Sequence, residues 1–469
     1  MIVDPSTTVI AALCIVTAAL LIIHRSRRSK KHVVVRLAGF SWTRDDFCRG
    51  WLITGDTGSG KTRSGITPLL FQLFKNEPTW GGLCIDDKGI YWETLSEMVK
   101  HFGREDDLIL LQVRSDDASS TWQPRYTYNI TSDRTIPYNT FAKAVVDTAA
   151  SLGQAGDKAF FKNQAQTHIA AALETLREIG ADVTLENAYH LLLDQSDLDE
   201  AMTDLASTLQ TIRRRELAEH FANRFLSQPP EQIGGVKETI ANYLQPFITP
   251  EIAQVFCAAG NSFDFSDLDR GKIICVAMPQ KFQMERRYIN TFLKMLFYTH
   301  ALRRFDKPAD ERQRDNLLIL WADEAQRFVT ASEDGMSDYN CIDVIREARA
   351  TVVAAAQSST SFIPPLGREK ACVFTLNLRN RLIFKAADEE GALESADFLG
   401  KKRVIKKSWG YHSGKMSRNY SEQEEHKIKP HILRNLRKHT AIVVHCERGH
   451  RRKALFPLEA NGEASPWFR

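Results

Sequence analysis

The chain has 469 residues, 43% of them hydrophobic and 26% charged, a composition typical of globular proteins. This composition excludes the disordered and fibrous classes, and the length suffices for two or three hydrophobic cores. The formal net charge of +4 is too small to indicate a nucleic-acid partner by itself, so the positions of the charges must decide.

An apolar segment near the N-terminus predicts one transmembrane helix. Val9 to Ile23 is apolar except for Thr17 and approaches the minimum length of a bilayer span. Five basic residues follow it within Arg25–Lys31 and Asp4 precedes it, the reverse of a secretory signal. Because basic flanks stay cytoplasmic, residues 1–32 are expected to form an uncleaved single-pass anchor, with the bulk of the chain cytoplasmic. A buried core helix is the alternative.

The apolar residues 51–54 lead into a glycine-rich loop that fits the P-loop pattern at every fixed position. Glycines let backbone N–H groups surround the phosphates, Lys61 adds a charge toward the β and γ oxygens, and the Thr62 hydroxyl suits Mg²⁺. The alternative is a glycine-rich surface turn. The loop predicts binding of ATP and Mg²⁺ by Gly55, Asp56, Thr57, Gly58, Ser59, Gly60, Lys61 and Thr62.

Strands and helices alternate as far as residue 113. A helix is expected after Thr62, and a strand at 82–85 ends on Asp86-Asp87-Lys88-Gly89. Carboxylates at the end of a parallel strand lie beside the nucleotide crevice of open α/β sheets. A helix around 92–102 and a strand at 108–113 follow, so residues 33–135 are interpreted as the first part of an α/β domain with a mostly parallel sheet.

Helical periodicity replaces this alternation over residues 136–252. Helices are expected at 157–179, 185–193, 212–226 and 235–243, with Gly180 and Pro229-Pro230 as breaks. Almost no strand pattern occurs in this segment. The sequence therefore predicts an inserted all-α domain, after which residues 253–469 complete the α/β domain.

A second motif follows in the resumed α/β segment. A strand at 272–278 and a long helix at 285–305 precede the apolar run 317–322, which ends on Asp323-Glu324. Asp323 is expected to complete the Mg²⁺ shell beside Thr62, and Glu324 to orient and deprotonate the attacking water. A strand that merely ends in two acids is common, but the intact P-loop favours the functional interpretation, and the glutamate favours hydrolysis over nucleotide storage.

Three polar residues flank the next strand, Thr351–Ala356. Gln357 closes it and is expected to sense the γ-phosphate. Arg346 and Arg349 precede it and are candidates for an arginine finger presented to a neighbouring subunit. A solvated helix face is the alternative for both arginines.

Basic residues gather near the C-terminus, with Trp409 and Tyr411 among them. They are expected either to line a channel that follows a phosphate backbone or to form a solvated charged surface. Histidines and carboxylates suggest no metal site beyond the nucleotide Mg²⁺, and the eight scattered cysteines are typical of reduced thiols. The basic clusters are Lys401–Arg403 with Lys406 and Lys407; Arg434, Arg437 and Lys438; and Arg448, Arg451, Arg452 and Lys453.

The chain resembles the type IV secretion coupling proteins, the TraG/TraD-like membrane-anchored ATPases of conjugative DNA transfer. The resemblance rests on the order of the P-loop, Asp86–Gly89, the helical insertion, Asp323-Glu324 and Gln357. The resemblance extends from about Val33 to the end of the chain. It implies a RecA-like P-loop NTPase domain, assembled as a homo-hexameric ring under an all-α domain at the bacterial inner membrane.

The resemblance also implies partners and function. Such a ring receives relaxase-bound single-stranded DNA of the relaxosome, or effector proteins, and passes them to the type IV secretion channel. Two departures stand out: one membrane span in place of the usual two, and Asp87 in place of the proline of the family's Asp-Pro-Lys-Gly motif, which predicts a looser loop. A DNA translocase of the FtsK/HerA type unrelated to secretion, and an ATP-switched receptor for secreted proteins, remain as alternatives.

Overall fold

The structure is a computed structural model that describes residues 32–151, 159–207, 211–332, 336–412 and 415–466. The expected membrane anchor at Val9–Ile23 lies outside these residues. Within the described ranges, no helix combines the length and the apolar character that a membrane span requires.

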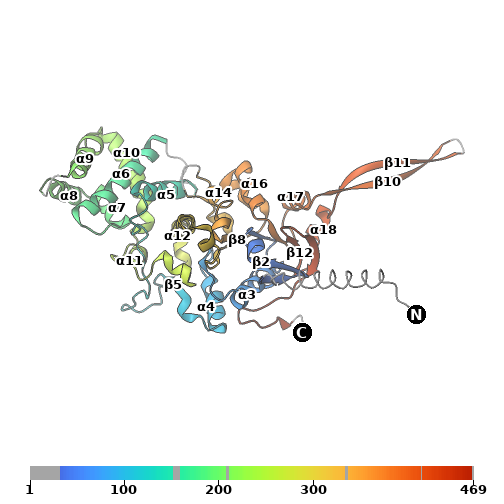
Figure 1. Ribbon diagram of the computed structural model, residues 1–469. Coiled ribbons are helices and arrows are strands. Elements are labelled where there is room, and N and C mark those ends of the chain that lie inside the picture. The colour runs from blue at the N-terminus through green and yellow to red at the C-terminus, as the bar shows by residue number, and fades with distance from the viewer. Residues whose placement is uncertain (1–31, 152–158, 208–210, 333–335, 413–414, 467–469) are drawn as a thin grey trace, which may run out of the picture.

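A nine-stranded sheet forms the centre of the molecule (Figure 1). The strands from β9 to β5 are parallel, and β12 and β13 add an antiparallel hairpin at one edge. The expected α/β class with a mostly parallel sheet is thus confirmed. In spatial order the strands are β13 (Gly449–Ala454), β12 (Thr440–His445), β9 (Asn380–Ile383), β3 (Trp51–Thr54), β8 (Ala350–Ala356), β7 (Leu318–Asp323), β4 (Gly81–Asp86), β6 (Ile273–Ala277) and β5 (Leu108–Gln112).

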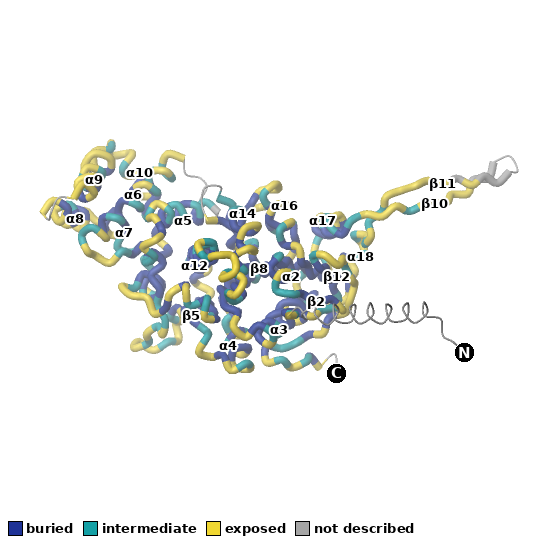
Figure 2. Tube along the Cα trace, viewed as in Figure 1, coloured by how far each residue is buried: buried dark blue, intermediate teal, exposed yellow. Residues whose placement is uncertain are grey.

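The central strands are buried on both faces, which is why they read as continuous apolar runs. Successive side chains alternate between two cores: Leu83 and Leu320 belong to one, Cys84 and Trp321 to the other. The first core also contains side chains of α12 (Gln283–Arg303), and the second contains those of α3 and α4. Helices therefore cover both faces of the sheet. Figure 2 shows that the centre of the molecule is buried. The bounds are α3 (Thr67–Asn76) and α4 (Tyr91–His101).

The segment expected to be helical contains α5 to α11 and lies at the end of the molecule away from β12 (Figure 1). Its helices pack around apolar side chains of the first core. These helices are α5 (Tyr138–Ser151), α6 (Ala159–Ile179), α7 (Leu185–Leu193), α8 (Gln195–Ser207), α9 (Ile212–His220) with a π-helical turn (Phe221–Phe225), α10 (Pro230–Leu244) and α11 (Pro250–Phe256).

Two details of this segment differ from the sequence-based expectation. The expected break at Pro229-Pro230 is present, but the next helix, α10, begins at Pro230 and not at Gly235, because the missing N–H of a proline has no intrahelical partner to lose at the first helical position. The helices α5, α8 and α11 were not expected individually. In α8, acidic and polar residues occupy most of the surface, and Leu198, Ala201 and Leu205 are its buried residues.

A long two-stranded ribbon projects from the body beside β12 (Figure 1). β10 (Lys401–His412) and β11 (Lys415–His426) pair antiparallel, and most of their described side chains are exposed (Figure 2). A smaller hairpin of β1 (Val33–Leu37) and β2 (Phe40–Thr43), followed by α2 (Arg44–Phe47), leads into the sheet at β3.

Candidate nucleotide-binding site

The glycine-rich loop lies at the carboxyl end of β3, between two parallel neighbours. Gly55 N–H donates to the carbonyl of Gln357 at 3.1 Å, and Asp56 N–H donates to the carbonyl of Lys385 at 2.8 Å. The residues that follow β8 and β9 therefore hold the entrance of the loop in place. This is the edge of an open parallel sheet at which ligands bind.

The backbone of the loop is open toward a ligand. Gly58 and Gly60 have φ of 79° and 97°, backbone angles that residues other than glycine rarely adopt. Lys61–Ile66 forms a π-helical turn that continues into α3. Its N-cap residue is Gly60, so no side chain caps the first N–H groups of this turn. Ser59 Oγ is buried without a hydrogen-bond partner among the described residues. Free donors at a helix N-terminus fit a bound phosphate group.

Lys61 and Glu324 approach each other at this edge. Lys61 Nζ lies 3.6 Å from Glu324 Oε1 and donates to the Ala356 carbonyl at 3.1 Å. Glu324 has a left-handed backbone with φ of 52°, and its Oε2 accepts from Gln326 Nε2 at 2.7 Å. Such strain in a non-glycine residue often marks a functional site. The two motifs predicted from the sequence thus meet, although they are more than 260 residues apart.

Two further carboxylates lie beside this pair. Asp323 and Asp86 end the adjacent strands β7 and β4 and are paired in register. Burial raises the pKa of Asp323, against the effect of Lys61, which lowers it. Burial, together with the Asp323 charge, raises the pKa of Asp86 to about 6, although backbone N–H groups of Ile90 and Tyr91 donate to Asp86 Oδ2. The negative charges of Asp323 and Asp86 repel each other, and a divalent cation bound between them would relieve this repulsion.

The structure places the other predicted residues at both ends of β8. Gln357 is exposed at the carboxyl end, beside the P-loop. Arg346 and Arg349 lie at the opposite end, where Leu318 N–H donates to the Arg349 carbonyl at 3.0 Å. The two arginines are therefore not brought to the P-loop of their own chain. A role toward a neighbouring subunit stays a prediction.

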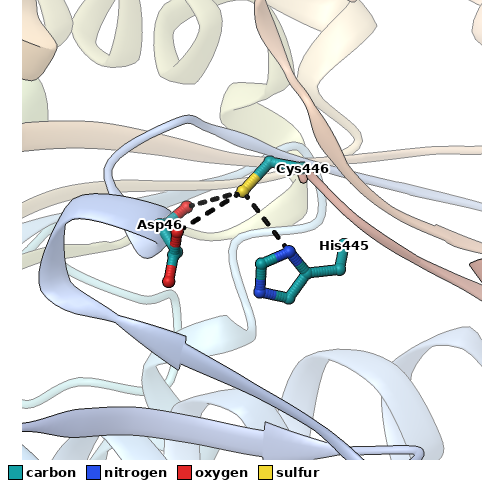
Figure 3. A group of neighbouring side chains, drawn as sticks. All are labelled: Asp46, His445 and Cys446. Carbon is teal, nitrogen blue, oxygen red and sulfur yellow. Dashed lines mark hydrogen bonds between the residues drawn. The ribbon is translucent and has the colours of Figure 1, made fainter. Parts of the chain in front are cut away.

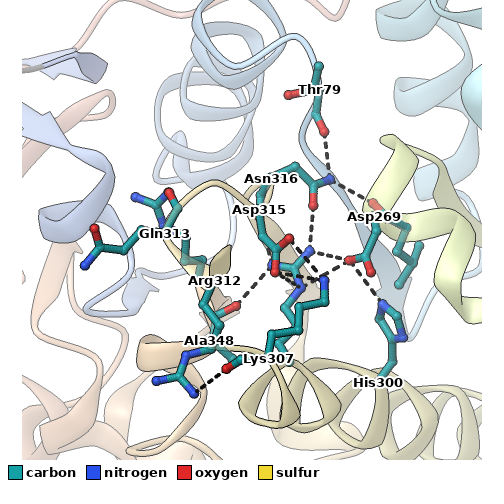
Figure 4. Close-up of polar contacts among 12 residues, drawn as sticks. Thr79, Asp269, His300, Lys307, Arg312, Gln313, Asp315, Asn316 and Ala348 are labelled. Atoms are coloured by element: carbon teal, nitrogen blue, oxygen red, sulfur yellow. Dashed lines mark hydrogen bonds and ion pairs between the residues drawn. The ribbon is translucent and has the colours of Figure 1, made fainter. Parts of the chain in front are cut away.

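A polar network fixes the turn that carries these two arginines (Figure 4). Arg304 donates to the Ala348 carbonyl at 3.1 Å and to the Asn316 carbonyl at 2.8 Å, and its guanidinium also pairs with Asp269. Although burial opposes the shift, hydrogen bonds from His300 and Arg304 hold the pKa of Asp269 well below its usual range. The turn is thus anchored to the end of α12.

The sequence of the chain matches the model of a known protein family. The model of the family described as "Type IV secretory system Conjugative DNA transfer" matches residues 9–449. The chain belongs to this type IV secretion family. The match includes the expected anchor segment, which the described residues do not contain.

Several solved structures have a fold similar to that of this chain. The unbound plasmid coupling protein TrwB lacking its N-terminal region has a TM-score of 0.66 at 17% identity, covering 94% of this chain and 92% of that one. TrwB with ADP and Mg²⁺ has a TM-score of 0.64 at 16% identity, covering 94% and 93%. VirB4 of Thermoanaerobacter pseudethanolicus has a TM-score of 0.50 at 13% identity, covering 89% and 90%. No curated protein matches the chain.

Side chains of α12 contact the loop that departs from the type IV secretion family's motif at Asp87. Asp87 Oδ1 accepts from Arg287 Nε at 3.0 Å, and the Asp87 carbonyl accepts from Arg286. Asn290 Nδ2 donates to the Asp86 carbonyl at 3.1 Å. The contact with Arg287 uses a side-chain oxygen that a proline lacks. Whether this loop is looser than in the rest of the family stays a prediction.

One residue that supports the P-loop, His439, was not predicted from the sequence. His439 Nδ1 lies 2.7 Å from Ser64 Oγ, and His439 N–H donates to the Ser59 carbonyl at 2.9 Å. A Cβ on Gly60 would lie 2.5 Å from His439 Nδ1, so the histidine closes directly over the loop. Burial, with Lys438 and Arg63 nearby, lowers the pKa of His439. No local motif marks this residue, which precedes β12 far along the chain.

The basic clusters expected to meet DNA lie in different surroundings. Lys407 and Trp409 are on the ribbon with their cross-strand partners Tyr420 and Arg418. Lys407 Nζ lies 5.7 Å from the Tyr420 ring centroid, and the Arg418 guanidinium 4.5 Å from that of Trp409. Both rings are more than half exposed. The ribbon thus presents a cationic and aromatic face to solvent.

The remaining clusters are also exposed, but three of their arginines already have partners. Arg434 Nη1 lies 3.9 Å from Glu389 Oε2. Arg451 donates to the Ala38 carbonyl at 3.3 Å and lies over the Phe40 ring. Arg448 donates to Ser41 Oγ at 3.3 Å. These two side chains hold the β1–β2 hairpin against β13, which is a structural role.

Proposed function

We propose that the chain is a membrane-anchored ATPase that couples ATP hydrolysis to the recruitment and translocation of DNA into a type IV secretion channel. The approach of Lys61 to Glu324 at the carboxyl edge of the sheet, in a chain of the conjugative DNA transfer family, carries this proposal. The TrwB structures with ADP and Mg²⁺ and with a non-hydrolysable ATP analogue support ATP and Mg²⁺ as the ligands.

The residues divide the chemistry among them. Lys61 and the loop N–H groups hold the phosphates, and Thr62 and Asp323 hold Mg²⁺, which neutralises charge that develops on the phosphoryl oxygens. Glu324 accepts the proton of the attacking water. Gln357 responds to the γ-phosphate from the end of β8, and Arg346 or Arg349 acts on the nucleotide of a neighbouring subunit.

The proposed assembly follows from the family and the predicted anchor. A homo-hexameric RecA-like ring at the bacterial inner membrane, with most of each chain in the cytoplasm, receives relaxase-bound single-stranded DNA from the relaxosome. The domain division into residues 1–32, 33–135, 136–252 and 253–469 belongs to the same proposal. The helices from α5 to α10 lie within residues 136–252, whereas α11 (Pro250–Phe256) extends beyond residue 252.

The exposed ribbon face suits single-stranded DNA, because bases stack on aromatic rings and cations neutralise phosphates. Between Val404 and Ser421 the sequence has four basic residues and no acidic ones. We expect the association constant for labelled single-stranded DNA, measured by fluorescence anisotropy on the detergent-solubilised full chain, to fall linearly with salt on a double-logarithmic plot.

Charge reversal at Lys407 and Arg418 is expected to reduce the steepness of that plot by about 1 to 2, since each phosphate contact contributes about 0.7. The matched control reverses Lys75 and Lys100, which are exposed on α3 and α4. If both double variants reduce the slope of the plot equally, net charge, and not the ribbon, determines binding.

A further inference from the structure

Three potential metal ligands meet where the N-terminal hairpin contacts the edge of the sheet (Figure 3). Asp46 belongs to α2, His445 is the last residue of β12, and Cys446 follows it. Cys446 Sγ lies 3.7 Å from His445 Nδ1 and 3.9 Å from Asp46 Oδ1. One ligand atom from each residue lies within 4.8 Å of the others. The cluster therefore joins segments 400 residues apart.

These separations fit one tetrahedral cation. Zinc binds thiolate sulfur at about 2.3 Å and imidazole nitrogen or carboxylate oxygen at about 2.0 to 2.2 Å, so the edges of a tetrahedral site that include sulfur measure about 3.5 Å. The observed distances from Sγ, 3.7 and 3.9 Å, exceed these edges by a few tenths of an ångström. The ligand atoms of Asp46 and His445 lie within 4.8 Å of each other, so these two side chains must also move closer to share one cation.

Neighbouring groups orient the ligands. His445 Nε2 lies 3.2 Å from the Ser41 carbonyl and donates to it, which leaves Nδ1 as the acceptor nitrogen of the ring. The ring also stacks on Trp42, with centroids 4.8 Å apart. Asp46 Oδ2 accepts from Thr43 N–H at 3.1 Å, so Oδ1 is the oxygen that faces Cys446. A cation would take the place of the Glu447 N–H, which donates to Nδ1 at 3.1 Å.

The charges around the cluster are partly balanced. Arg49 pairs with Glu447 at 2.5 Å, and Arg448 is held at Ser41. Burial, with Asp46 nearby, raises the pKa of the Cys446 thiol to about 11, and burial lowers the pKa of His445. A divalent cation would replace the thiol proton, as is usual for metal-bound cysteine.

We propose that Asp46, His445 and Cys446 bind one Zn²⁺ ion, with water in the fourth position. This departs from the expectation of no metal site beyond Mg²⁺, because the sequence places Asp46 far from the other two ligands. The ion would tie α2 to β12, the strand that directly follows the P-loop contact His439. The site is independent of the proposed motor function.

Cobalt is the probe for this site, because Co²⁺ bound to thiolate absorbs in the near ultraviolet. The full chain, purified with a chelator and without nucleotide or Mg²⁺, should gain this absorption with one equivalent of Co²⁺ and lose it on addition of Zn²⁺. Cys446→Ser should abolish the absorption. The matched control, Cys372→Ser, removes an exposed cysteine on α16 (Arg368–Asn377) and should retain it.

A second variant keeps the test decisive if Cys446→Ser does not fold. Asp46→Asn keeps an acceptor for Thr43 and should weaken Zn²⁺ binding, measured by competition with a chromogenic chelator, by at least about tenfold. Absence of the thiolate absorption in the wild-type chain, its persistence in Cys446→Ser, or unchanged Zn²⁺ affinity in Asp46→Asn would each overturn the proposal.

Discussion

Lys61→Ala is expected to lower the steady-state rate of ATP hydrolysis by at least about 100-fold, as the loss of one preorganised charge at a reacting group does in other enzymes. Lys61 is buried at the P-loop, with its Nζ held between the Ala356 carbonyl and Glu324. Its removal takes away the charge directed at the β and γ phosphates and the ion-pair partner of Glu324. Phosphate release measures the rate.

The control for this variant is Lys75→Ala, which removes an exposed lysine at the last turn of α3. It should hydrolyse ATP at the wild-type rate, because it lies outside the P-loop. A Lys61→Ala chain that retains more than about a tenth of wild-type turnover would exclude this lysine from transition-state stabilisation.

Glu324→Gln is expected to bind ATP as the wild type does but to hydrolyse it about 10² to 10⁴ times more slowly, the usual contribution of a general base. The amide keeps the size of the side chain and its contact with Gln326, but it cannot accept a proton from water. The variant should therefore retain ATP, which a filter-binding assay with labelled nucleotide measures beside phosphate release.

Glu311→Gln provides the same chemical change at an exposed position in α13 (Ala309–Arg312) and should leave both measurements unchanged. Wild-type hydrolysis by Glu324→Gln would assign the base to another residue. A loss of ATP binding would instead mean that Glu324 acts by holding Lys61.

The parts of the site that the sequence predicted are contiguous motifs on buried strands. The P-loop and Asp323-Glu324 each combine an apolar run with a fixed order of polar residues, so local pattern and location agree. The parallel sheet followed from the same apolar runs, because strands covered on both faces have few polar residues.

Contacts between distant segments could not be predicted in this way. His439 reaches Ser64 across 375 residues, and no local pattern connects them. The ribbon was also missed, because its strands are exposed and carry charged residues on both faces, without the apolar alternation that indicates a half-buried strand.

The most direct test of the account is the rate of ATP hydrolysis by the full chain, measured with and without single-stranded DNA across a series of salt concentrations. If the chain couples hydrolysis to DNA movement, DNA should increase the rate, and the increase should weaken as salt rises because phosphate contacts are screened. A rate that does not respond to DNA at any salt concentration would contradict the DNA motor and favour an ATP-switched receptor for secreted proteins.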